Sequence, residues 1–63
     1  MTELTKMYNE MLVTLEKGIN DLEKFEDGNM SAGTRVRKTM QTTKELAQKI
    51  RVTVQEQKNA VAA

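Results

Sequence analysis

The residues that could bind another molecule are cations in the second half of the chain. They recur every seven residues, at Arg37, Lys44, Arg51 and Lys58. On a helix this spacing forms one ridge that drifts by about 20° per step. Arg35, Lys38 and Lys49 lie on other sides of the same helix. Arg35 and Lys38 also lie near a helix start with hydroxyls at Ser31 and Thr34, where free N–H groups favour anions.

These cations predict contact with phosphates. The predicted contacts are Arg35, Arg37, Lys38, Lys44, Lys49, Arg51 and Thr34. A ridge of Lys and Arg beside an apolar stripe is equally typical of a helical bundle, where it pairs with Glu on a neighbouring helix. Both interpretations stay open. No aromatic platform or Asn/Gln pair indicates base reading, so binding to nucleic acid should be independent of sequence and steeply salt-dependent.

The composition argues against an enzyme. The chain has no His and no Cys, the residues best suited to proton transfer and thiolate chemistry near neutral pH. It has no Walker-type loop and no cluster spaced for a metal ion, and its carboxylates lie on a solvated helix face. We expect no catalytic residue, metal, cofactor or small-molecule substrate.

The charge is divided between the two halves of the chain. Residues 1–28 hold three Lys against seven Asp and Glu, and residues 29–63 hold seven Lys and Arg against two Glu. Such asymmetry is typical of proteins that contact polyanions. No apolar run reaches about 18 residues and no secretory signal begins the chain, so we expect a cytoplasmic, nucleoid-associated protein or a viral DNA-associated one.

Residues 2–26 are predicted to form the first helix. Positions spaced alternately by three and four are apolar with one exception, at Met1, Leu4, Tyr8, Met11, Leu15, Gly18, Leu22 and Phe25. Met7, Leu12 and Ile19 widen the stripe beyond a two-stranded seam, which favours a bundle. Gly18 indicates either a close approach between helices or a kink.

The stretch 27–29 is predicted to be a tight turn. Gly28 can adopt the left-handed conformation that ends a helix, and Asn29 is a good N-cap for the next one. A link this short sends the second helix back antiparallel to the first.

Residues 30–59 are predicted to form the second helix, with a ragged C-terminus at 60–63. Its stripe is smaller and more polar than the first, at Val36, Met40, Thr43, Ala47, Ile50, Val54, Gln57 and Val61, with Leu46 beside it.

The fold predicted for 1–63 is a single all-α unit, an antiparallel helical hairpin. Two extended helices bury little apolar surface, so we expect the hairpin to associate with itself, as an antiparallel dimer that forms a four-helix bundle. The expected core is Leu4, Tyr8, Met11, Leu15, Leu22, Phe25, Val36, Met40, Ala47, Ile50 and Val54.

One stretch resembles a known family. Gly28, Asn29 and the run Ala32-Gly33-Thr34-Arg35-Val36-Arg37, followed by Ala47 and Arg51, are similar to the bacterial linker-histone-like nucleoid proteins of the chlamydial type, over about residues 10–58. Similar short chains occur in other bacteria and in large DNA viruses. The resemblance implies a helical protein that condenses DNA without sequence preference, with Arg35, Arg37 and Arg51 as cationic positions.

The chlamydial members continue into a long Lys/Ala-rich tail that this sequence does not contain. Either the second helix itself binds DNA, or the helices supply only the oligomerising part of the activity. The leading hypothesis is therefore a small histone-like protein that binds double-stranded DNA as a homodimer. The alternative is a coiled-coil interaction or scaffold module that binds no nucleic acid. Binding to a membrane surface is the weakest option, because the apolar face lacks Trp and large hydrophobes.

Overall fold

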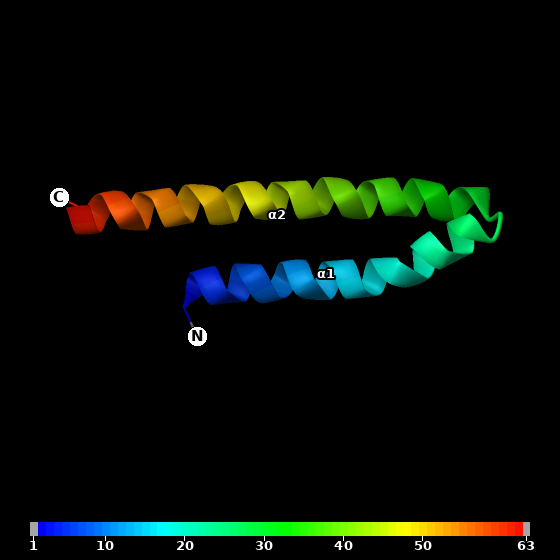
Figure 1. Ribbon diagram of the computed structural model, residues 1–63, viewed down its shortest axis with the longest axis horizontal. Coiled ribbons are helices and arrows are strands. Elements are labelled where there is room, and N and C mark those ends of the chain that lie inside the picture. Colours follow the sequence, from blue (N-terminus) through cyan, green and yellow to red (C-terminus); the bar gives the residue numbers. More distant parts are fainter. Residues whose placement is uncertain (1, 63) are drawn as a thin grey trace.

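The computed structural model describes residues 2–62, which form two antiparallel helices joined by a tight turn (Figure 1). Helix α1 is Glu3–Glu26 and helix α2 is Met30–Ala62. The molecule measures 53 × 19 × 11 Å, so it is a flat rod one helix thick. The predicted helical hairpin is confirmed. The start of α1 and the end of α2 lie at the same end of the rod, where α2 extends past α1 (Figure 1).

The start of α1 is capped by a threonine. Thr2 has an extended backbone, and its hydroxyl accepts a hydrogen bond from the Thr5 N–H at 3.3 Å. Glu3 in the first turn adds a carboxylate at the positive end of the helix dipole.

The turn satisfies the open ends of both helices. Gly28 has a φ of 103°, and its N–H donates to the Phe25 carbonyl while the Asn29 N–H donates to the Lys24 carbonyl at 2.9 Å. These two bonds form a Schellman motif. The Asn29 side chain then accepts from the Ala32 N–H at 3.3 Å and so caps α2. Gly28 and Asn29 thus play the two roles expected from the sequence.

The helices meet along a seam of small and medium side chains. Its buried or half-buried members recur by three and four on both helices: Leu4, Met7, Met11, Thr14, Gly18 and Asp21 on α1, and Ala32, Val36, Thr39, Thr43, Leu46, Ile50 and Thr53 on α2. Ala32 and Leu46 are the buried hydrophobic residues of the described chain. We call this set the inner seam.

Two glycines let the helices approach closely. A Cβ on Gly18 would lie 2.9 Å from the Thr39 Cγ2, and one on Gly33 would lie 2.7 Å from the Phe25 ring. Gly18 therefore serves the close approach that was one of its two predicted roles. Near the turn α1 bends toward α2 (Figure 1), and there Phe25 packs on Gly33.

Helix α2 continues to Ala62, past the predicted end at residue 59. No Gly or Pro follows Asn59, and Ala is the best helix former, so nothing in this stretch interrupts the helix. The expected ragged end at 60–62 is therefore helical, and residue 63 lies outside the described residues.

Candidate nucleic-acid interface

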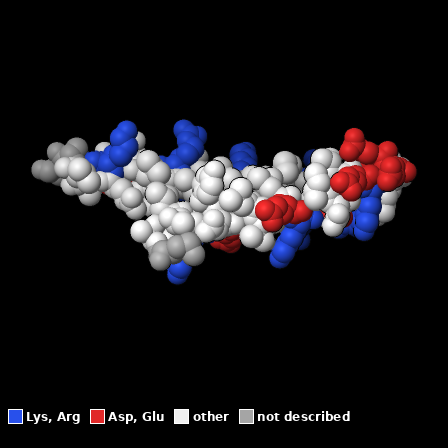
Figure 2. Space-filling view, turned by 60° about the horizontal axis from the view of Figure 1, so that its bottom comes forward, with Lys and Arg blue, Asp and Glu red and all other residues white. Residues whose placement is uncertain are grey.

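The cations of α2 stand on the surface of the rod. All seven Lys and Arg residues of this helix are exposed, as is Thr34. Since Val36, Leu46 and Ile50 face α1, the helix turns the ridge Arg37, Lys44, Arg51 and Lys58 outward, along one border of the rod. We call these four residues the basic edge. Figure 2 shows basic side chains at regular intervals along the side formed by α2, while acidic side chains gather at the turn.

The remaining predicted contacts point elsewhere. Arg35 and Lys49 are fourteen residues apart, so they lie on the same side of α2, on the other face of the rod. There Lys49 lines a shallow groove with Glu3 and Glu10. Lys38 and Thr34 lie on the outer side of α2, between that face and the basic edge. The structure thus spreads the predicted contacts around the exposed side of α2 and aligns three of them, Arg37, Lys44 and Arg51, in one row.

Arg35 differs from the other cations because it is held by an acid. Its Nε donates to the Asp21 Oδ1 at 2.8 Å, across the two helices. Residues 2–62 contain no second ion pair, so no residue of the basic edge is paired with a carboxylate there. The sequence analysis placed the carboxylates on a solvated helix face, and for Asp21 this is wrong, because its side chain is half-buried and faces α2. Its seven-residue spacing from Met7 and Thr14 is the signal that places it on the inner seam.

Lys58 is a basic-edge residue that the predicted contacts omitted. Its seven-residue spacing from Arg51 was visible in the sequence. In the structure Lys58 lines a shallow groove with Leu4, Val54 and Val61, at the end of the rod away from the turn. Lys58 therefore borders an apolar surface and lies far from the acidic residues of the turn.

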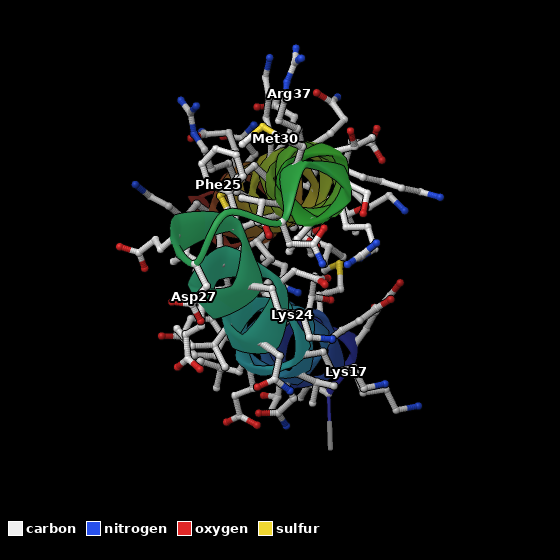
Figure 3. All side chains as sticks on the ribbon, turned by 90° about the vertical axis from the view of Figure 1, so that its right-hand side faces the viewer. Lys17, Lys24, Phe25, Asp27, Met30 and Arg37 are labelled. Carbon is white, nitrogen blue, oxygen red and sulfur yellow. The ribbon has the colours of Figure 1, made fainter. Side chains whose placement is uncertain are left out.

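Viewed from the turn, the labelled cations of α1 and α2 lie on different sides of the rod (Figure 3). Arg37 points away from the rod beyond α2, whereas Lys17 and Lys24 project from α1 (Figure 3). This separation provides cations with which the basic edge can be compared experimentally.

The predicted core residues fall into two groups in the single chain. Leu4, Met11, Val36, Ala47 and Ile50 are half-buried. The others remain exposed: Tyr8, Leu15, Leu22, Phe25, Met40 and Val54. The core was predicted as one set for the four-helix bundle, so the burial of this second group stays a prediction.

The described residues contain neither a metal-binding cluster nor a membrane-spanning helix. Residues 2–62 contain no group of three His, Cys, Asp or Glu side chains that could hold a metal ion. Neither α1 nor α2 combines the length and the apolar character needed to cross a membrane.

Comparison with protein families gives one match. The family model described as Histone H1-like protein Hc1 matches residues 4–60, which cover both helices and the turn. Neither the curated proteins nor the solved structures gave a match.

Proposed function

The chain belongs to the family of Histone H1-like protein Hc1, and on that premise we propose that it binds double-stranded DNA without sequence preference and organises it. Phosphates are contacted by cations of α2, as in a small nucleoid-associated or viral DNA-associated protein. The observation that carries the proposal is the basic edge, a row of exposed cations free of ion pairs in the described chain.

The dimensions of the basic edge suit a duplex. Its members are seven residues apart, about 10.5 Å along the helix axis, so Arg37 and Lys58 are about 31 Å apart. That length corresponds to roughly nine base pairs at 3.4 Å each. This is almost one turn of the duplex, so a straight row of cations crosses both backbones and can meet phosphates where it crosses them, without any base being distinguished.

The cations differ in how freely they can meet phosphates. Arg51 and Lys58 lie farthest from the acidic turn, so they contribute most. Arg37, Lys38, Lys44 and Lys49 add to the attraction, and Thr34 can donate a hydroxyl hydrogen bond. Arg35 joins only when its ion pair with Asp21 opens.

The described residues of α2 offer no means of stacking bases, since the chain's aromatic residues, Tyr8 and Phe25, both belong to α1. Stacking is the usual basis of single-strand binding. Binding should therefore favour duplexes of any sequence.

A gel-shift salt series with a duplex of random sequence tests the proposal. Affinity should fall steeply with salt, by about 0.9 in the logarithmic slope for each phosphate contact. The double variant Arg51→Glu, Lys58→Glu should bind at least about tenfold more weakly, with a slope shallower by about 1.8.

The matched control is Lys17→Glu, Lys24→Glu, which changes the net charge equally but alters α1. It should weaken binding by less than about threefold. Absence of a shift at low salt would exclude the function, and equal losses in both double variants would exclude the basic edge as its site.

A scaffold function is the second candidate, favoured by the apolar residues that the hairpin leaves exposed on α1. It predicts that the Arg51→Glu, Lys58→Glu variant retains its protein partner. The scaffold function is favoured over DNA binding if the wild-type chain shows no affinity for DNA at any salt concentration.

A further inference from the structure

The hairpin leaves one of its two flat faces apolar. The exposed members on α1 are Tyr8, Leu12, Leu15, Ile19 and Leu22, and their counterparts on α2 are Met40 and Val54. Leu15, Ile19, Leu22 and Met40 line one groove between the helices, which shows that both helices contribute to the same face. We call these seven residues the apolar face. All seven are 38–57% exposed, and large apolar surfaces are rarely left open in soluble monomers.

The apolar residues of α1 on this face have the spacing of a second helix contact. Residues 8, 12, 15, 19 and 22 alternate by four and three, as the inner seam does. Helix α1 thus carries two adjacent seams, of which α2 covers one. A helix in a four-helix bundle meets two neighbours in this manner.

The surface area indicates how much of the molecule is left uncovered. The chain exposes 5178 Å², whereas a compact protein of its mass exposes about 4,100 Å². Two separate chains therefore expose about 10,400 Å² in total, against about 6,800 Å² for one compact protein of twice the mass. The difference, at most about 3,500 Å², lies in the range of obligate homodimer interfaces.

The charges that border the apolar face are complementary. The border on α2 is the basic edge, and the border on α1 carries Glu16 and Glu23. Gly18 lies beside Thr39 and Asp21 beside Arg35, so these two acids are level with the stretch 34–41 of α2, close to Arg37 and Lys44. If α1 of one copy covers α2 of another at the same level, Glu16 and Glu23 of the first copy therefore lie close to Arg37 and Lys44 of the second.

We propose that two copies of the chain pair through their apolar faces, related by a twofold axis parallel to the helices. Helix α1 of each copy covers α2 of the other, and both turns lie at the same end, in place of the antiparallel dimer expected from the sequence. Glu16 and Glu23 of one copy then flank Arg37 and Lys44 of the other. A twofold axis perpendicular to the helices would instead place the two basic edges against each other, which like charges disfavour.

This arrangement leaves the far end of the rod basic. At this end of α1 the charges of Glu3 and Lys6 offset each other, and Glu3 lies on the opposite face, where it lines a groove with Lys49. The four cations that two copies supply at Arg51 and Lys58 therefore lie at one end of the bundle. The pairing itself does not depend on DNA, so it can be tested in its absence.

Light scattering after size exclusion, without DNA, tests the pairing. The wild-type chain should have twice the 7.2 kDa mass of one chain at about 100 µM. A single-chain mass, or that of three or more chains, would overturn the proposal.

Two adjacent residues provide a matched pair of variants. Leu12 and Val13 are 44% and 46% exposed, yet only Leu12 lies on the apolar face. Leu12→Asp should give a single-chain mass and Val13→Asp the wild-type mass. Equal behaviour of the two variants, with helix content retained in circular dichroism, would contradict the interface.

Cysteine pairing tests the orientation and also covers the case in which Leu12→Asp fails to fold. The chain has no Cys, so Glu16→Cys and Lys44→Cys can be prepared separately and mixed under mild oxidation. The mixed disulfide between the two variants should exceed either symmetric disulfide at least about fivefold. Predominance of the Lys44→Cys symmetric product would indicate the perpendicular axis and overturn the proposal.

Discussion

Gly28 is the residue on which the turn depends. Its φ of 103° is a conformation that residues with a Cβ rarely adopt. Gly28→Ala should therefore lower the free energy of unfolding by about 1 kcal/mol, measured by urea denaturation followed by circular dichroism. Asn20→Ala, an exposed substitution inside α1, is the control and should leave stability equal or slightly higher. Equal stability of Gly28→Ala and wild type would contradict the role of the turn.

The ion pair between Asp21 and Arg35 links stability to DNA binding at the scale of single residues. The Arg35 side chain is 48% exposed and that of Asp21 23%, so solvent screens the pair and its loss should cost less than about 1 kcal/mol. Asp21→Asn also frees Arg35 for phosphates. We expect this variant to bind DNA about two- to fivefold more tightly in the gel-shift assay.

Glu26→Gln, at an exposed residue of α1, makes the same charge change as Asp21→Asn and leaves the ion pair intact. Its effect on DNA affinity measures the general contribution of one unit of charge. An equal gain in both variants would show that Arg35 does not reach phosphates when released.

At the scale of helices, the inner seam depends on few large side chains. Leu46 is 6% exposed, and truncation of a buried Leu costs about 2–5 kcal/mol. Leu46→Ala should therefore abolish most of the thermal transition in circular dichroism. Val52→Ala, at a residue 44% exposed on the same helix, should shift the transition by only a few degrees. A similar small shift for Leu46→Ala would show that the seam contributes little.

The turn and the two helices could be predicted from the sequence because their signals are local. Gly28 and Asn29 specify a helix end and a helix start within two residues, and the spacing of apolar residues on either side specifies helices. The family could be recognised from the run that begins at Ala32.

The pairing of helix faces could not be predicted in the same way. The apolar arc of α1 is wide enough for two neighbours, and nothing local decides which half meets α2. In the structure that half includes Thr14 and Asp21, while Leu15 and Leu22 remain exposed. On α2 the sequence analysis placed Leu46 only beside the predicted stripe and omitted Ala32, Thr39 and Thr53 of the same row. Thr and Ala carry little hydrophobic signal, although small side chains are what a close helix approach requires.

At the scale of the whole molecule, stability and association should be coupled. A flat rod one helix thick has little interior, and the proposed dimer would add to its burial by at most about 1,750 Å² per chain. The midpoint of thermal unfolding should therefore rise with protein concentration, by about 4 °C or more for a tenfold increase. Scans between about 5 and 500 µM measure this dependence. A midpoint independent of concentration would show that a single hairpin is stable alone.

Tyr8 is the only tyrosine of the chain, which has no tryptophan, and it lies on the apolar face with 57% of its surface exposed. When fluorescence is excited at a wavelength that tyrosine absorbs and Phe25 does not, it therefore originates from a single ring on that face. Quenching by acrylamide reports whether the ring is covered, without a label or a substitution. The molecule thus carries its own optical probe at the surface where two copies would meet.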